Sequence, residues 1–280
     1  MIFDNTNCLL GEGPLWHPTR NQLFWFDILG RKLHTTAQNW SFSNFVSAAG
    51  WVSQDQLMIA SDKALSLFNL TTGASEMLVP LEADNPETRC NDGRADPYGG
   101  FWIGTMGLSA QAKAGSIYRY YRGELRKIIS DITVTNAICF GPDGTTAYYT
   151  DSADPRIMRL RLDPKDGWPT GDAQVHIDLR ADDRIPDGAV VDAAGNLWNA
   201  QWESGRVATY DPAGKFLFAT DFPAIKTTCP AFGGADLSTL FCTSAAVDLS
   251  QEHLATHPDS GRTFAVQTNH TGQREHQVIL

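Results

Sequence analysis

Hydrophobic and polar positions alternate along this chain in a pattern that repeats. Short runs of aromatic and aliphatic residues are separated by turns containing Pro, Gly, Asp or Asn, and helical periodicity is nearly absent. Four runs occupy the same place in the repeat: Asn-Gln-Leu-Phe-Trp-Phe at 21–26, Gly-Phe-Trp-Ile-Gly at 100–104, Thr-Ala-Tyr-Tyr-Thr at 146–150 and Asn-Leu-Trp-Asn-Ala at 196–200. A second, alternating run follows, such as Ser-Ile-Tyr-Arg-Tyr at 116–120. The pattern predicts many short β-strands.

The repeat predicts a closed all-β fold. Six segments share the order turn, apolar strand, turn and strand: 17–36, 53–73, 96–128, 141–167, 192–215 and 233–272. Their turns recur about every 35–51 residues, which is the length that a four-stranded blade requires. We therefore expect one six-bladed β-propeller domain spanning residues 1–280. We expect a strand at about 2–10 to complete the last blade and short helical turns at about 249–255.

Four oxygen-bearing side chains share one register of this repeat. Each precedes its turn position by six residues, and they are Glu12, Asn91, Asn136 and Asp187. The matching positions in the other two units are Ala48 and Thr228. Because equivalent positions of a propeller recur around its axis, we expect the four to meet at one end of the central channel. Arg89, two residues before Asn91, is placed to hold a hydroxylated or anionic substrate at the same mouth.

This set of side chains predicts a divalent metal site. Two carboxylates and two amides suit Ca²⁺, Mg²⁺ or Mn²⁺, and accept Zn²⁺ or Fe²⁺ when water completes the shell. The plain alternative is that Asn, Asp and Gly merely form turns here, as they do in many proteins. The shared register favours a joint site, although it names no reaction.

Composition narrows the class of protein. The net charge of −10 argues against nucleic-acid binding, which needs clustered Lys and Arg. The first residues lack the pattern of a signal peptide, and no apolar run reaches the ~20 residues of a membrane span, so we expect a cytoplasmic protein. The five cysteines are scattered without CxxC pairs and indicate small buried thiols. Cys90, beside the predicted site, is an alternative candidate for a catalytic thiolate. Three tryptophans are expected to line a cleft: Trp16, Trp51 and Trp202.

Strings along nearly the whole chain resemble the SMP-30/gluconolactonase/LRE-like family, also called the regucalcin group. They include Gly-Glu-Gly-Pro-Leu-Trp at 11–16, Arg-Cys-Asn-Asp-Gly at 89–93, Gly-Gly-Phe-Trp-Ile-Gly-Thr-Met at 99–106, Thr-Asn at 135–136, Pro-Asp-Gly at 186–188 and Cys-Pro-Ala-Phe-Gly-Gly at 229–234. Two positions depart from the family pattern. Ala137 replaces a glycine after Asn136, and the loop at 107–111 lacks the acidic residues of some animal members, which leaves the substrate open.

The resemblance implies a six-bladed propeller that hydrolyses a sugar lactone to the aldonic acid with one divalent ion, whether Ca²⁺, Mn²⁺, Mg²⁺, Zn²⁺ or Fe²⁺. Glu12, Asn136 and Asp187 resemble the family's metal ligands, and Arg89 and Asn91 resemble its substrate contacts. Among the ligands, we expect Asp187 to act as the general base. We expect a monomer or a weak homo-oligomer whose partner is a small-molecule lactone. The alternatives are a promiscuous metal-dependent esterase or phosphotriesterase, and a calcium-binding propeller without enzymatic activity.

Overall fold

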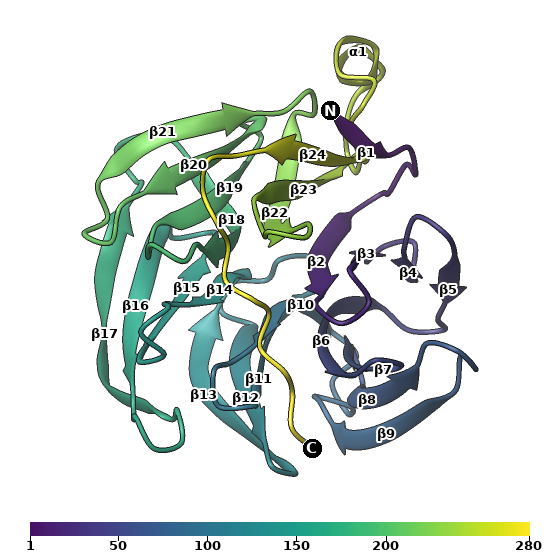
Figure 1. Cartoon of the computed structure of the whole chain (residues 1–280), viewed down its shortest axis with the longest axis vertical. Helices are drawn as coiled ribbons and strands as arrows, with labels where there is room; N and C mark the ends of the chain where they lie inside the picture. Colours follow the sequence, from purple (N-terminus) through teal and green to yellow (C-terminus); the bar gives the residue numbers. More distant parts are fainter.

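The computed structural model describes all residues 1–280 and forms a ring of six four-stranded antiparallel sheets (Figure 1). The first blade is β2 (Gly11–His17), β3 (Gln22–Asp27), β4 (Lys32–His34) and β5 (Asn39–Ser41). The second is β6 (Val46–Ser53), β7 (Gln56–Ser61), β8 (Ala64–Asn69) and β9 (Ser75–Pro80). The third is β10 (Thr88–Ala95), β11 (Phe101–Gly107), β12 (Gly115–Tyr121) and β13 (Glu124–Ile132).

The remaining blades follow the same order around the ring. The fourth is β14 (Thr135–Phe140), β15 (Thr146–Asp151), β16 (Arg156–Leu162) and β17 (Pro169–Asp178). The fifth is β18 (Ile185–Val191), β19 (Leu197–Trp202), β20 (Arg206–Tyr210) and β21 (Phe216–Asp221). The sixth is β22 (Lys226–Gly233), β23 (Thr239–Ala245), β24 (Thr263–Gln267) and the N-terminal β1 (Ile2–Asp4). The predicted six-bladed propeller is therefore confirmed, and each predicted segment contains the two middle strands of a blade.

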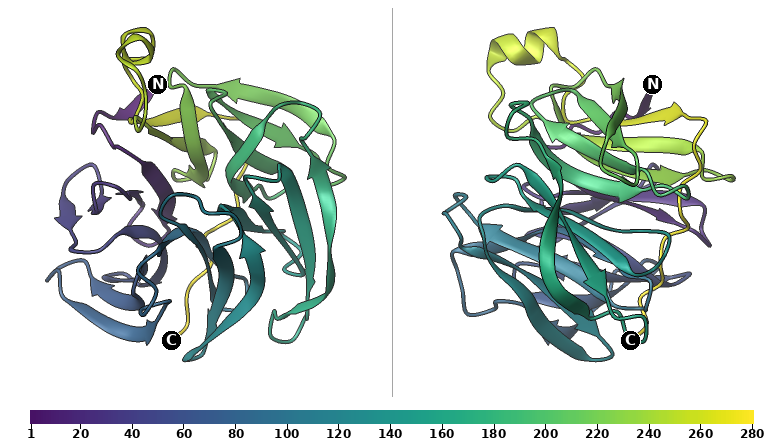
Figure 2. Two further views of the ribbon diagram at one scale, coloured as in Figure 1. Left: turned by 180° about the vertical axis from the view of Figure 1, so that it is seen from behind. Right: turned by 90° about the vertical axis from the view of Figure 1, so that its left-hand side faces the viewer.

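Two elements predicted near the ends of the chain are present in the structure with slightly different bounds. The N-terminal strand does complete the last blade, because β1 pairs with β24, but it ends at Asp4 rather than near Leu10. Asp4 Oδ1 accepts the Thr6 N–H at 2.8 Å, and this turn directs the chain toward the first blade. Leu10 forms only an isolated bridge to Ala245. The helical turn is α1 (Gln251–Thr256), which protrudes from the ring (Figure 2).

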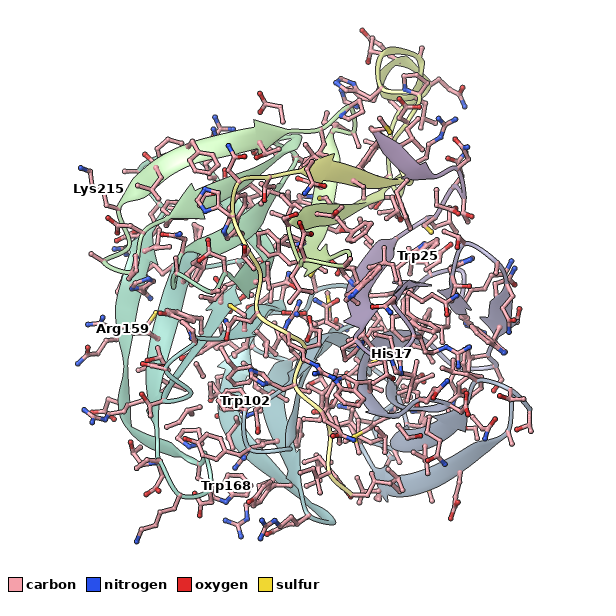
Figure 3. All side chains as sticks on the ribbon, viewed as in Figure 1. His17, Trp25, Trp102, Arg159, Trp168 and Lys215 are labelled. Carbon is pink, nitrogen blue, oxygen red and sulfur yellow. The ribbon has the colours of Figure 1, made fainter.

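The core is divided among the interfaces between neighbouring blades. One cluster joins Phe24 and Leu33 of the first blade to Leu57 of the second, and comparable clusters join each later pair. Both faces of a blade are thus covered, which explains why β3 is almost entirely buried instead of alternating. Trp25 and Trp102 lie inside the blades, whereas Arg159 and Lys215 project from the edge of the disc (Figure 3).

The C-terminal strap, residues 268–280, crosses one face of the ring (Figures 1 and 2). It passes from the sixth blade toward the second and bonds to the blades along its way. Thr271 O accepts the Ala193 N–H at 2.8 Å, and the Val278 N–H donates to Trp51 O at 2.9 Å. Glu275 pairs with Arg94 at the end of β10. This end of the central channel is therefore covered. No helix in the structure has the length and apolar character to cross a membrane.

Candidate functional site

The predicted site residues lie near the start of the inner strands, at the end of the channel opposite the strap. Each sheet has one edge strand that contacts the corresponding strands of the two neighbouring sheets around the ring, and these inner strands are β2, β6, β10, β14, β18 and β22. A cavity of about 550 Å³ opens at this end. Its lining includes the complete predicted set: Glu12, Arg89, Asn91, Asn136 and Asp187. Each of these side chains is buried, with residue exposures of 4–8%.

Irregular backbone at the site register aims these side chains into the cavity. The pairing register of every inner strand shifts there, for example between Glu12 and Leu15 and between Asn136 and Cys139. Gly13, directly after Glu12, has φ 52°, and a Cβ at this residue would lie 2.2 Å from Ser47 O. Only glycine fits this position. Ala137 occupies the corresponding place after Asn136 with φ 55° and keeps the same left-handed backbone at a cost of roughly 1–2 kcal/mol.

A chain of hydrogen bonds orients the two amides. The guanidinium Nη1 of Arg89 donates to Asn91 Oδ1 at 2.7 Å, and Asn91 Nδ2 donates to Asn136 Oδ1 at 3.1 Å. Asn136 Nδ2 donates in turn to Ser152 Oγ at 2.9 Å. The hydroxyl of Ser152 then donates to Pro186 O at 2.7 Å, beside Asp187. Ser152 was not predicted from the sequence, since a lone serine after a strand carries no signal of this kind.

The two carboxylates of the set lack adequate counter-charge. Burial raises the pKa of Glu12 to about 8, and the charge of Asp92 adds to the effect. Burial also raises the pKa of Asp187 well above its usual value, and repulsion from the Glu12 carboxylate is the second cause of this rise. Arg89 is the cation that opposes both shifts, and burial lowers its own pKa. Two acids that repel each other in a buried cavity fit a bound cation, which would favour their ionised forms.

The types of the candidate ligand atoms indicate which metal ions this site would bind. The structure has no group of three or more His, Cys, Asp and Glu side chains placed to hold a metal ion. The candidate ligands are two carboxylates and an amide oxygen, which leaves further positions for water or substrate. Hard oxygen ligands of this kind suit Ca²⁺, Mg²⁺ or Mn²⁺. The residues present therefore fit a divalent ion held by Glu12, Asn136 and Asp187.

Other sequence-based candidates have different outcomes. All five cysteines are free and buried, as predicted. Burial raises the pKa of Cys90 to about 12, so its thiol is not an activated nucleophile. Of three tryptophans expected to line a cleft, Trp202 lines the cavity. The expectation for the other two was wrong: the Trp51 Nε1–H donates to Glu275 O in the strap, and Trp16 stacks on Phe241. Both come late in their inner strands and thus lie toward the opposite end of the channel.

Comparisons with known proteins agree with the fold and the motifs. The model of the SMP-30/gluconolactonase/LRE-like region matches residues 10–246. A solved structure described as the calcium-binding protein regucalcin from Agrobacterium tumefaciens superimposes with a TM-score of 0.97 at 41% identity, covering 100% of this chain and 97% of that one.

Two curated relatives act on sugar lactones according to their names. The 6-deoxy-6-sulfogluconolactonase of Pseudomonas putida is 32% identical over 95% of this chain and 94% of its own length. The L-arabinolactonase of Azospirillum brasilense is 32% identical over 97% of this chain and 92% of its own length. The chain belongs to the SMP-30/gluconolactonase/LRE-like family.

Proposed function

We propose that this protein hydrolyses a sugar lactone to the corresponding aldonic acid with a divalent ion held by Glu12, Asn136 and Asp187. The observation that carries the proposal is that these three line one cavity together with Arg89 and Asn91. The names of the relatives, which are sugar lactonases, support the same reaction.

The chemistry requires a base, an orienting group and charge stabilisation. A divalent cation bound to this donor set supplies Lewis acidity toward a carbonyl oxygen. Asp187 accepts a proton from the attacking water, because a carboxylate beside a cation stays ionised near neutral pH. The water oxygen bonds to the carbonyl carbon, the bond from this carbon to the ring oxygen breaks, and the ring oxygen leaves as a hydroxyl group after taking up a proton. The product acid then ionises.

The remaining polar groups position the substrate. Arg89 holds the side chain of Asn91 in the cavity lining through the 2.7 Å bond to its Oδ1, and Asn91 Nδ2 donates to Thr135 O at 2.8 Å. Asn136 is neutral and limits the negative charge of the donor set. The buried location of all three side chains strengthens their interactions with a polar substrate.

An ion-binding propeller without catalysis is the main rival. The printed description of the Agrobacterium tumefaciens structure as calcium-binding is consistent with it. The cavity of about 550 Å³ above the donor set favours catalysis, since an ion alone needs no such space.

An Asp187→Asn variant tests the assigned base. We expect lactone hydrolysis to fall at least about 100-fold in a pH-indicator assay corrected for spontaneous ring opening, because general-base catalysis is lost. Asp221→Asn is the matched control, since this exposed acid lies in the outermost strand β21, does not line the cavity and should keep nearly full activity. Circular dichroism and metal analysis would accompany both variants. Full activity of Asp187→Asn with its metal bound would contradict the assignment.

A further inference from the structure

The cavity has a polar floor and apolar walls. Ten of its 18 lining residues are hydrophobic. Those most relevant to a substrate come mainly from the loops at this end of the ring: Leu29, Met106, Leu108, Val134, Ile185 and Val247. Leu108 and Ile185 remain 46% and 39% exposed at the mouth, whereas Glu12 and Asp187 on the floor are 5% exposed. Large apolar side chains left exposed around a cavity indicate that a ligand covers them.

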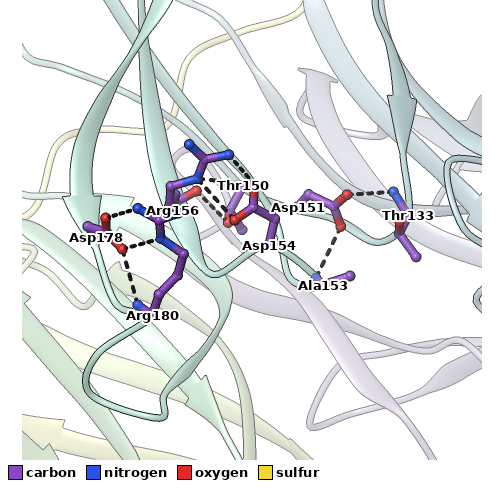
Figure 4. A network of polar contacts seen from close by, with 8 residues as sticks. All are labelled: Thr133, Thr150, Asp151, Ala153, Asp154, Arg156, Asp178 and Arg180. Carbon is purple, nitrogen blue, oxygen red and sulfur yellow. Dashed lines mark hydrogen bonds and ion pairs between the residues drawn. The ribbon is translucent and has the colours of Figure 1, made fainter.

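Hydrogen bonds hold the apolar wall in place. The carboxylate of Asp151 accepts the N–H groups of Thr133 at 2.8 Å and Val134 at 3.0 Å, and the first of these bonds is drawn in Figure 4. The Leu108 N–H donates to Glu87 O at 2.8 Å, and the Val247 N–H donates to Leu9 O at 2.9 Å. Because these four amide groups already have acceptors, they offer no donor to a substrate hydroxyl.

The charges around the cavity disfavour an anionic substituent on the substrate. Arg89 is the only cationic side chain in the lining, and its Nη1 already donates to Asn91 Oδ1 and Cys90 O. Lys226 lies behind Trp202, with Nζ 4.7 Å from the ring centroid, and donates to Val247 O at 2.9 Å. On the rim, Asp248 adds a negative charge. Only Nε and Nη2 of Arg89 are then left for a phosphate, sulfonate or carboxylate on the substrate, and this residue is 8% exposed and held beside Asn91, in contrast to Leu108 and Ile185 at the mouth.

We infer that the preferred substrate is a neutral lactone whose side chain, on the ring carbon beside the ring oxygen, ends in a methyl group, as in a 6-deoxyaldonolactone. The inference rests on the lactone hydrolysis proposed above. With the carbonyl group at the polar floor, the substituent farthest from the carbonyl points toward Leu108, Val134 and Ile185. A methyl group there covers apolar surface, whereas the hydroxyl of a hydroxymethyl group loses water beside these three apolar side chains.

The reaction remains the same hydrolysis and needs no further reactant. Water adds to the carbonyl carbon, the ring carbon–oxygen bond breaks, and the 6-deoxyaldonic acid forms with its new hydroxyl on the former ring oxygen. The methyl group takes no part in bond changes. Its effect is on binding and positioning alone.

Three lactones of one ring configuration test the preference. They are 6-deoxy-D-galactono-1,4-lactone, D-galactono-1,4-lactone and galactaro-1,4-lactone, which differ in carrying a methyl, hydroxymethyl or carboxylate group. With enzyme supplied with Mn²⁺, we expect kcat/KM for the methyl lactone to exceed that for the hydroxymethyl lactone about 10- to 100-fold, since loss of one buried polar partner has this size of effect. The carboxylate lactone should be slowest. L-Rhamnono- and L-mannono-1,4-lactone repeat the first comparison in a second configuration.

A variant of the wall locates the origin of the preference. Leu108→Gln should lower the ratio of the two kcat/KM values about tenfold, mainly through a higher KM for the methyl lactone. Leu217→Gln is the matched control, because Leu217 in β21 is 44% exposed and does not line the cavity, and it should leave the ratio unchanged. Equal or faster hydrolysis of the hydroxymethyl lactones would overturn this inference alone. Failure to hydrolyse any lactone of the panel would instead overturn the proposed function.

Discussion

At the residue scale, Glu12 and Asp187 place two acids where solvent cannot stabilise their charges. Each is 5% exposed. Burial raises the pKa of both, the charge of Asp92 further raises the pKa of Glu12, and the charge of Glu12 further raises the pKa of Asp187. Arg89 alone does not balance them, since it is itself buried and bonded to Asn91. The stability of the folded state near this site therefore depends on a proton or a cation being present.

The need for a proton or a cation at this site should be visible in the pH dependence of stability. In chelator-treated protein, the pKa of Glu12 is about 8 when folded, compared with an ordinary value of 4.5, so the folded state binds more protons between these pH values. The resulting stabilisation is fully present below pH 4.5 and is lost as the pH rises through 8. The free energy of unfolding should fall by up to about 1.4 kcal/mol per pH unit for one such group.

Thermal unfolding from pH 5 to 8.5, with chelator and with excess Mn²⁺ or Ca²⁺, measures the effect. Added cation should flatten the curve, because it replaces the proton between the carboxylates. Glu12→Gln should also reduce the slope in chelator. A metal-free protein whose stability rises over this pH range would contradict the described electrostatics.

At the element scale, one short strand contributes to the closure of the ring. β1 pairs only with β24, through Ile2–Phe264 and Asp4–Thr263, and so joins the two ends of the chain. The ring of Phe3 in β1 packs edge-to-face against the rings of Phe241 and Trp25, with centroid distances of 4.8 Å and 6.3 Å. These contacts connect the sixth blade to the first.

Phe3→Ala tests whether this closure stabilises the ring. We expect the free energy of unfolding to fall by about 2 kcal/mol, since a half-buried aromatic side chain is lost, and we expect faster hydrogen exchange in β24. Phe216→Ala is the matched control, because Phe216 belongs to another outermost strand, β21, and is 48% exposed. It should cost less than half as much in urea unfolding. Equal costs for the two variants would argue against a closing role of β1.

At the scale of the whole molecule, the two ends of the channel differ. The site end opens through the cavity, and the opposite end is covered by the strap, where Glu275 pairs with Arg94. The two side chains are only 7% and 11% exposed. The strap also contacts blades that are far apart in the sequence, because Gln273 Nε2 donates to Phe140 O and Val191 O, both at 2.9 Å. It therefore ties several blades together at once.

Glu275→Gln should destabilise the whole ring. Removing the carboxylate leaves Arg94 buried beside fewer negative charges, although Asp92 remains near it. We therefore expect the free energy of unfolding in denaturant to fall by about 2–3 kcal/mol. Glu124→Gln breaks an exposed pair with Arg126 and should leave the thermal midpoint essentially unchanged. Equal losses of stability in the two variants would mean that the buried pair of Glu275 and Arg94 stabilises the fold no more than the exposed pair does.

Particular residues show how far the sequence alone reaches. Leu23–Phe26 and Phe101–Ile103 predicted the second strands of their blades, because aromatic and β-branched runs bounded by turns are a local signal. The register of Glu12, Asn91, Asn136 and Asp187 predicted a shared location, since cyclic repetition converts equal spacing into equal position. The family motifs added the expected reaction and site residues.

Only the tertiary structure decided which residues surround that register. Leu108, Ile185 and Val247 come from different blades and share no spacing, so no periodic signal could unite them as a wall. Trp51 faces the strap instead of the cavity, and Glu275 reaches Arg94 across 181 positions of the chain. The sequence by itself determined the ring and the chemistry at its axis, because both follow from a local repeat. The folded chain determined the shape and closure of the channel, because these depend on non-repeating segments brought together only by packing.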